Sequence, residues 1–167
     1  MQRYFIEAFT LLAPLWTADF ALNYWYYLRK RYGWWDYPLD SNKNFFDGKR
    51  IFGNSKTVLG LPISLIFGTL GGFIISDPFI GCFLGLMVYL AAIIAGFTKR
   101  RLGLQRGAAF PVIDQTDYII AAYMGLKLLG MEFVSDEGFI AAFFISLVIH
   151  SSSNVIGYYL GIKKNPW

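Results

Sequence analysis

Apolar residues occur along this chain in five long blocks rather than in short alternation. Each block approaches the roughly 20 residues that an α-helix needs to cross a bilayer. The predicted spans cover residues 5–28, 57–76, 79–97, 112–129 and 139–160. The pattern predicts an all-α integral membrane protein, a bundle of five transmembrane helices that forms a single domain over residues 1–167.

The junction between the second and third blocks predicts how these two helices meet. The Asp77-Pro78 dipeptide offers an N-cap and a first-turn proline. A turn this tight makes the two spans antiparallel neighbours. Small residues on both spans would let their backbones approach closely. These residues are Gly68, Gly71, Gly72, Gly81 and Gly85.

Basic residues are concentrated in two of the loops and in the tail. Of the fifteen Lys and Arg, seven lie in residues 29–56, four in residues 99–111 and two near the C-terminus. The positive-inside rule places these segments in the cytoplasm and the N-terminus outside. The protein is therefore predicted to lie in the cell membrane as a multi-pass protein. Lys127, near the outer end of its span, should extend towards Glu132 or Asp136.

Composition supports a membrane protein and bears on its partners. Hydrophobic residues make up 56% of the chain and charged residues 16%, whereas soluble domains have about 45–50% and about 25%. The net charge of +4 matters less than its clustering, which suits anionic lipids or nucleotides. We expect the bilayer to be a partner and nucleic acid not to be one, and we predict no oligomeric state.

The chemistry is predicted to centre on residues 99–117. A cationic loop there is followed by Asp114 and Asp117, which an i,i+3 spacing places on one face of a helix near the cytoplasm. Cations suit phosphates, and two carboxylates that would otherwise repel suit a divalent metal such as Mg²⁺. The alternative is that both acids only complement the helix dipole, which explains one acid better than two.

Polar residues inside the first and fifth spans predict a cavity. Asp19 and Asn23 are one turn apart, as are His150 and Asn154, and all four fall in the inner half of the membrane. We expect a polar cavity open to the cytoplasm, because an isolated buried carboxylate is costly. For His150 and Asn154, hydrogen bonding between helices of a dry bundle is an equal alternative.

The predicted N-termini of the second and fourth spans face the same compartment and could bind phosphate groups. Residues 29–56 supply further cations near the second span, namely Lys43, Lys49, Arg50 and Lys56. The basic run Arg29-Lys30-Arg31 has a different interpretation. It closes an apolar block rich in aromatic residues and is expected to be a solvated, lipid-facing surface.

Two sequence blocks resemble the CDP-diacylglycerol synthase superfamily of CDP-alcohol-lipid cytidylyltransferases. One block pairs a basic run with later aspartates, as Lys99-Arg100-Arg101-Leu102-Gly103, then Pro111, then Asp114-Gln115-Thr116-Asp117. The other matches a D-G-x-R-x-x-G-x-x-K-T-x-x-G pattern from Asp47 to Gly60. Gln115 replaces the arginine of the superfamily and a glycine-histidine segment is missing. Both departures resemble the archaeal branch, CDP-archaeol synthase.

The resemblance implies that CTP and an unsaturated isoprenoid glycerol ether-lipid phosphate, of the 2,3-bis-O-geranylgeranyl-glycerol 1-phosphate type, react to CDP-archaeol and diphosphate. Mg²⁺ would be held by Asp114 and Asp117, which together with Lys56 and Arg100 would form the catalytic set facing the cytoplasm. Asn54, Gln105 or Asp47 would contact the base or ribose. The implied nucleotide and phosphate ligands are Lys43, Asp47, Lys49, Arg50, Asn54, Lys56, Thr57, Arg100, Arg101, Gln105 and Arg106.

Two other functions fit part of the pattern. A CDP-alcohol phosphotransferase would need two aspartate pairs separated by an Ala-Arg step, and only one such pair is present. A small transporter or channel could use Asp19 and His150 as a relay inside the membrane. That alternative leaves the cation–carboxylate cluster near the cytoplasm without a role.

Overall fold

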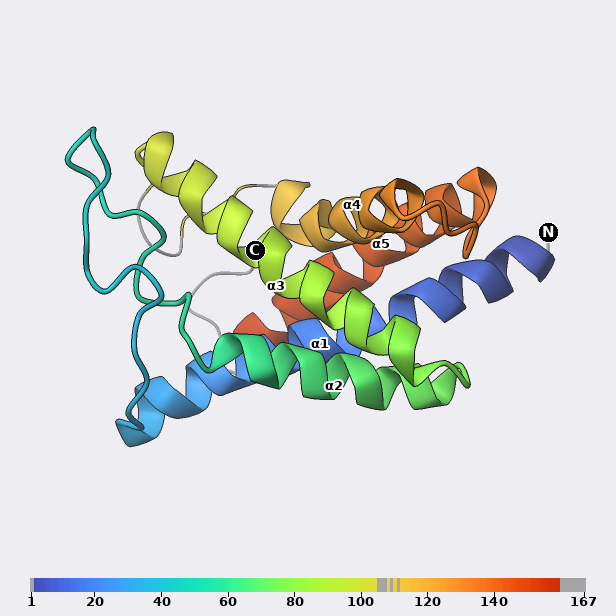
Figure 1. Ribbon diagram of the computed structural model, residues 1–167, viewed down its shortest axis with the longest axis horizontal. Coiled ribbons are helices and arrows are strands. Elements are labelled where there is room, and N and C mark those ends of the chain that lie inside the picture. Colours follow the sequence, from blue (N-terminus) through green and yellow to red (C-terminus); the bar gives the residue numbers. More distant parts are fainter. Residues whose placement is uncertain (1, 105–107, 109, 111, 160–167) are drawn as a thin grey trace.

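The computed structural model describes residues 2–104, 108, 110 and 112–159, and every named element among them is an α-helix. In order, the helices are α1 (Gln2–Tyr32), α2 (Gly60–Ile74), α3 (Pro78–Arg101), α4 (Ile113–Leu128) and α5 (Asp136–Tyr159). Figure 1 shows them side by side, with the loop of residues 33–59 extending beyond one end of the bundle. The predicted all-α class is confirmed.

The helices differ in their capacity to cross a membrane. By length and composition, α1, α3 and α5 are long and apolar enough to do so. The helices α2 and α4 have 15 and 16 residues, or about 22–24 Å at 1.5 Å per residue, against a hydrocarbon core of about 30 Å. Length and composition therefore favour three of the five predicted spans, and the crossing of the membrane by all five stays a prediction.

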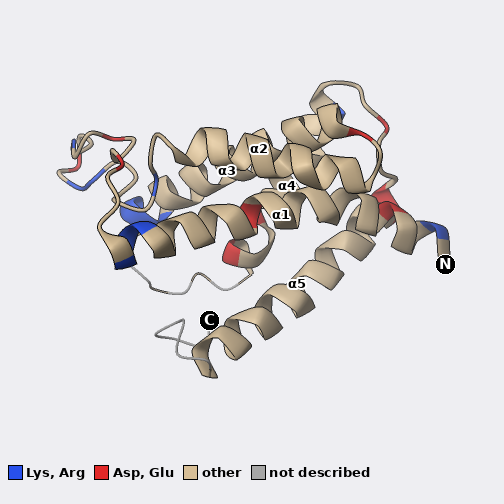
Figure 2. Ribbon diagram, turned by 90° about the horizontal axis from the view of Figure 1, so that it is seen from below, with Lys and Arg blue, Asp and Glu red and all other residues tan. Residues whose placement is uncertain are grey.

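The hydrophobic core forms around α1, which contacts all four other helices. Leu11, Leu12 and Leu15 of α1 are almost completely buried, and they share one cluster with Leu84 of α3 and Ile119 of α4. Figure 2 shows Lys and Arg gathered mainly at the end of the bundle where α1 and α3 finish. That end also carries the loop of residues 33–59 (Figure 1).

The contact between α2 and α3 depends on glycine. A Cβ placed on Gly68 would lie 2.5 Å from the carbonyl oxygen of Gly81, so no larger residue fits at this crossing. Gly71 faces α1 instead, where a Cβ would lie 2.6 Å from the Cα of Pro14. The predicted close packing of these helices is confirmed.

Local predictions at the helix ends are also confirmed. Asp77 Oδ1 accepts a hydrogen bond of 3.0 Å from the backbone N–H of Ile80 and so caps α3, with Pro78 in the first turn. At the same end of the bundle, Lys127 Nζ lies 3.1 Å from Asp136 Oδ1. The Asp77 cap lets α3 begin soon after α2 ends, so that the two helices reverse direction within a few residues.

Candidate active site

A pocket of about 310 Å³ lies where the loop of residues 33–59 meets the bundle. Every helix except α2 contributes to its described lining. The lining residues are Asp19, Asn23, Phe52, Gly53, Asn54, Ser55, Lys56, Val88, Ala92, Ala95, Gly96, Lys99, Arg100, Phe110, Asp114, Gln115, Asp117, Tyr118, His150 and Asn154. Residues from distant parts of the sequence therefore converge on one polar space.

The acidic side of the pocket comes from the first turns of α4. Asp114 and Asp117 both line the pocket, and Asp19 of α1 lies in the same space. Asp114 Oδ2 accepts hydrogen bonds from Lys99 Nζ at 2.7 Å and from the backbone N–H of Phe110 at 3.1 Å. Asp117 Oδ1 accepts one from the N–H of Tyr118 at 2.8 Å. These carboxylates keep coordination capacity, because each offers further lone pairs to a ligand.

Two carboxylates in one polar pocket are a donor set that suits Mg²⁺. This ion is commonly held in nucleotide sites by one or two carboxylates together with substrate phosphates and water. Among the described residues, no group of three or more His, Cys, Asp or Glu side chains is arranged as a complete protein-only site. Asp114 is bound to a cationic group already, the ammonium of Lys99, which shows that its carboxylate is oriented to receive positive charge.

The basic side of the pocket combines Lys56, Lys99 and Arg100. Burial lowers the pKa of Lys56, and the charges of Asp117 and Asp19 act against that effect. Arg100 Nε is buried and has no hydrogen-bond partner among the described residues. A buried N–H donor of this kind is suited to an anionic ligand such as a phosphate.

A glycine on α3 makes room for Lys56. A Cβ on Gly96 would lie 3.2 Å from Lys56 Cε and 3.3 Å from the carbonyl oxygen of Phe52. The bare backbone of α3 at this point therefore lets the lysine side chain cross the helix and reach the pocket from the loop. Thr57, the residue after Lys56, is held by Tyr89, whose hydroxyl donates to the Thr57 carbonyl oxygen at 2.7 Å.

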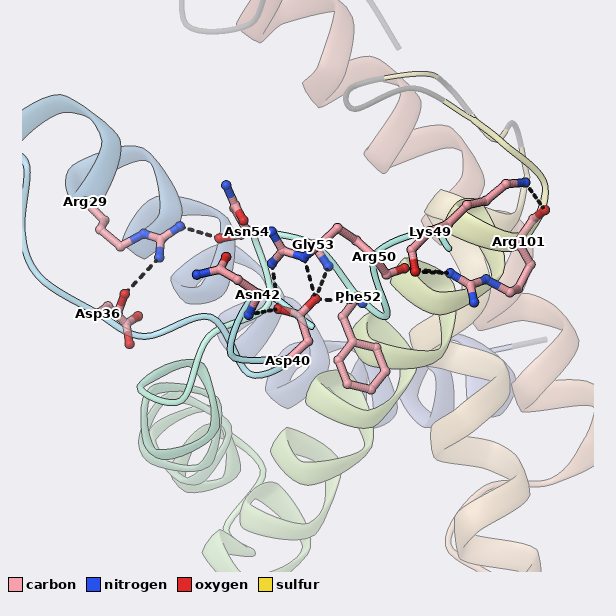
Figure 3. A network of polar contacts seen from close by, with 10 residues as sticks. All are labelled: Arg29, Asp36, Asp40, Asn42, Lys49, Arg50, Phe52, Gly53, Asn54 and Arg101. Carbon is pink, nitrogen blue, oxygen red and sulfur yellow. Dashed lines mark hydrogen bonds and ion pairs between the residues drawn. The ribbon is translucent and has the colours of Figure 1, made fainter. Parts of the chain in front are cut away.

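Several predicted phosphate ligands have other partners. Arg50 pairs with Asp40 at 2.6 Å, and Arg101 pairs with Asp47 at 2.9 Å. Arg101 Nη2 also donates to the carbonyl oxygen of Arg50 at 2.6 Å, and Lys49 Nζ donates to the carbonyl oxygen of Arg101 at 3.1 Å. The contacts of Arg101 with Lys49 and Arg50 attach the loop to the end of α3 (Figure 3), whereas the Arg50–Asp40 pair lies within the loop.

The remaining predicted ligands divide into three groups. Asn54, Lys56 and Arg100 line the pocket. Lys43 is exposed and Thr57 is buried, and neither lines it. Gln105 and Arg106, with Pro111 of the sequence motif, lie outside the described residues. The assignment of all these side chains to substrate stays a prediction.

Arg29 has protein partners that the expected solvated, lipid-facing surface did not include. Its guanidinium is half-buried and donates to the carbonyl oxygens of Asn54 and Asp36 (Figure 3). Asp36 in turn accepts from Trp25 Nε1 at 2.9 Å and from the N–H of Leu59 at 3.2 Å. Arg29 therefore fixes the loop to α1. Its hydrogen bonds to backbone carbonyls offset part of the free-energy cost of removing the guanidinium from water.

The four predicted intramembrane polar residues all line the pocket: Asp19, Asn23, His150 and Asn154. The His150 ring lies 6.3 Å from the ring of Tyr118, centroid to centroid. Tyr118 also shares a hydrogen bond with Ser146, which joins α4 to α5. His150 therefore lines the pocket and also lies beside a ring of α4, and its place in a cavity open to the cytoplasm stays a prediction.

Two residues with a clear structural role are not marked by the sequence pattern. Lys99 is one residue of a basic run, although it is the direct partner of Asp114. No motif marks Asp40, because its surroundings form only once the loop is folded. For Lys99, its place in the basic block ahead of the two aspartates was a usable signal.

Comparison with known proteins agrees with this site. The family model described as CarS-like, CDP-archaeol synthase, matches residues 74–167. CDP-archaeol synthase of Pyrobaculum arsenaticum is 37% identical over 140 residues, which cover 80% of this chain and 84% of the relative. That of Saccharolobus islandicus is 36% identical over 136 residues, which cover 78% and 81%.

The fold also matches a solved structure, described as an intramembrane enzyme for archaeal membrane lipids biosynthesis. The TM-score is 0.72 at 23% identity, and the match covers 90% of this chain and 94% of the other. At this identity the likeness concerns the fold. The relatives and the family model together show that the chain belongs to the CDP-archaeol synthase family, whose members are cytidylyltransferase enzymes.

Proposed function

We propose that this protein transfers the cytidylyl group of CTP to an isoprenoid glycerol ether-lipid phosphate of the 2,3-bis-O-geranylgeranyl-glycerol 1-phosphate type. The products are CDP-archaeol and diphosphate, and the reaction depends on Mg²⁺. The observation that carries the proposal is a pocket that combines Asp114 and Asp117 with Lys56, Lys99 and Arg100. The curated relatives, named CDP-archaeol synthase, supply the substrate class.

The pocket suits a reaction between two polyanions. An oxygen of the lipid phosphate attacks the α-phosphorus of CTP, a new P–O bond forms, and the bond from the α-phosphorus to the bridging oxygen breaks. The diphosphate leaves with that oxygen and its electron pair. No general base is needed, because the attacking phosphate is already an anion. The barrier is lowered by positioning and by charge stabilisation.

Arg100, Lys56 and a bound metal ion each have a place in this scheme. Arg100 offers its buried Nε–H to a phosphate oxygen, and Lys56 reaches the same space from the loop. Mg²⁺ bound by Asp114 and Asp117 would neutralise phosphate charge and polarise the α-phosphorus. Asp19 keeps the adjacent wall of the pocket polar.

We further propose that the pocket opens towards the cytoplasm of the cell membrane. Support comes from the basic residues in the last turns of α1 and α3, which lie on the side of the pocket. The positive-inside rule favours that side as cytoplasmic. CTP would then enter from the aqueous phase, while the lipid phosphate approaches along the bilayer.

Purified protein in liposomes with the lipid phosphate and CTP labelled at its α-phosphate tests the proposal. We expect label in the extracted lipid with Mg²⁺ and none with a chelator. Asp114→Asn and Asp117→Asn should each lower kcat by about 100-fold or more. Asp77→Asn, at the opposite end of α3, is the matched control and should stay active. Unlabelled lipid, or full activity in both site variants, would refute the proposal.

A further inference from the structure

Asp40 lies outside the pocket but holds the segment of residues 52–56 that forms one of its walls. Its side chain is fully buried. Oδ2 accepts hydrogen bonds from the backbone N–H groups of Phe52 at 3.0 Å and Gly53 at 2.9 Å. Both donors belong to residues that line the pocket. The Asp40 side chain therefore binds the backbone of this segment (Figure 3). The side chains that the segment turns towards the pocket are left free.

The same carboxylate engages the other side of the loop. Arg50 donates to it twice, from Nη2 at 2.6 Å to Oδ1 and from Nε at 3.2 Å to Oδ2. The N–H of Asn42 donates to Oδ1 at 3.1 Å. Five hydrogen bonds thus meet on one buried carboxylate, so that a charge costly to bury is fully compensated. A bidentate pair of this kind fixes direction as well as distance.

The residues beside Asp40 extend the attachment to Lys56. The N–H of Leu39 donates to the Lys56 carbonyl oxygen at 2.8 Å. Residues 39 and 40 therefore hold the segment at Phe52, Gly53 and Lys56. Gly53 has a φ of +95°, a backbone conformation that favours glycine, and its N–H is one of those bound by Asp40.

The bonding of Asp40 also sets its charge. Burial alone would raise the pKa of Asp40, but hydrogen bonds from Arg50, Gly53 and Phe52 outweigh burial and lower the pKa to about 2. The carboxylate is consequently ionised at every pH relevant to the cell. Its counter-charge is Arg50, and this pairing directs the Arg50 guanidinium towards the loop interior.

We propose that Asp40 is a positioning residue for nucleotide binding: it holds the segment of residues 52–56 so that Lys56 and Asn54 present their side chains to CTP. The inference rests on the proposed function and deepens it. Arg50 belongs to the same unit and acts through Asp40 rather than on a phosphate. Displacement of a binding wall by about 1 Å is enough to cost up to 100-fold in rate.

Steady-state kinetics of Asp40→Asn in liposomes test the inference. Asparagine keeps the size of the side chain but removes its charge and half of its acceptor capacity. We expect KM for CTP to rise about tenfold or more when it is measured well below the thermal unfolding midpoint, which loss of the charged contact with Arg50 also lowers. A variant that only misfolds loses kcat and keeps KM. Asp77→Asn is the matched control, an aspartate that also accepts a backbone N–H.

Arg50→Lys provides a second and milder variant. Lysine keeps the positive charge but not the bidentate geometry, so a several-fold rise of KM for CTP is expected even if Asp40→Asn does not fold. In the double variant the two effects should not multiply, because both act through one contact. Unchanged KM in a folded Asp40→Asn variant, or multiplicative effects in the double variant, would overturn the inference.

Wild-type activity separates the two claims. If the wild type transfers no label from CTP, the proposed function fails. If the wild type is active and Asp40→Asn keeps its KM for CTP, only the positioning role fails. Trypsin cleavage near Lys49 and Lys56 adds a readout without substrate: it should be faster in Asp40→Asn than in Asp77→Asn, and equal rates would count against the attachment.

Discussion

Lys99 Nζ lies 2.7 Å from Asp114 Oδ2 and 2.5 Å from Oδ1, so the end of α3 and the start of α4 meet through an ion pair inside the pocket. The Lys99 and Asp114 side chains are 21% and 31% exposed. A partly exposed pair of this kind contributes little to stability. If Asp114 holds a divalent cation as proposed, that cation would share or replace the contact with Lys99.

Lys99→Gln should make the protein easier to saturate with Mg²⁺. Without the ammonium, the negative charge of Asp114 is no longer neutralised, and its attraction for a divalent cation increases. We expect the Mg²⁺ concentration for half-maximal activity to fall several-fold, while KM for CTP rises because a cation is lost from the phosphate site. A Mg²⁺ titration of the cytidylyltransferase reaction measures both.

The matched control for Lys99 is Lys127→Gln. Lys127 also pairs with an aspartate, Asp136, at 3.1 Å, but at the opposite end of the bundle. Removal of this exposed pair should leave both the stability and the Mg²⁺ titration nearly unchanged. A half-maximal Mg²⁺ concentration that is unaltered in both variants, or that falls equally in both, would contradict the competition between Lys99 and the metal.

Gly96→Val should disturb the pocket without unfolding the bundle. Valine needs the space through which Lys56 crosses α3, where even a Cβ would lie 3.2 Å from Lys56 Cε. Displacement of Lys56 should lower kcat/KM for CTP by about tenfold or more. Ile94→Val, at an exposed position of the same helix, is the control. Equal kinetic constants for the two variants would show that Lys56 does not need this path.

Gly68→Ala should destabilise the contact between α2 and α3. The added Cβ would lie 2.5 Å from the Gly81 carbonyl oxygen, a backbone atom that cannot move independently of α3. Overpacking of this kind costs about 1–3 kcal/mol. Thermal unfolding in detergent should show a lower midpoint than for Leu70→Ala, which truncates an exposed residue of α2. An unchanged midpoint would mean that the helices separate without cost.

Acid should weaken the wild type through Asp40. Its pKa is about 2 in the folded protein and 3.8 when unperturbed. A carboxyl group whose pKa is lower in the folded state stabilises the fold above its unfolded pKa. This stabilisation, roughly 2 kcal/mol, is present above about pH 4 and is lost as the pH falls towards 2.

Denaturant unfolding of the wild type and Asp40→Asn at several pH values measures this effect. Tryptophan fluorescence is a suitable signal, because Trp25 donates to Asp36 at the base of the same loop. The stability difference between the two proteins should narrow between pH 5 and pH 2. A constant difference over that range would indicate that Asp40 does not change its protonation during unfolding.

Much of the fold could be predicted from the sequence because the signals are local. The Asp77-Pro78 cap and the glycines of α2 and α3 depend on nearest neighbours along the chain or on the lack of a side chain. The limits of α2 and α4 were less accurate: apolar composition continues past the helix ends, so the blocks of residues 57–76 and 112–129 exceed the helices inside them.

The site was only partly predictable, because its contacts join residues that are far apart along the chain. Composition reveals that a segment is basic, but not which cation turns inward. Lys56 and Arg100 line the pocket, while Arg50 and Arg101 pair with carboxylates of the loop. Those pairings join residues up to 54 positions apart along the chain, and nothing in the local pattern of residues 40–50 specifies them.

The last turn of α3 contains three consecutive basic residues that make different contacts. Lys99 and Arg100 face the pocket, whereas Arg101 stacks between the rings of Phe45 and Phe97, with 4.9 Å from its guanidinium carbon to each centroid. One residue inserted upstream would rotate this run by about 100°. Composition would be almost unchanged, yet the residues that line the pocket and the residue that packs against the loop would be exchanged, so the arrangement at this end of the bundle depends on the register of α3.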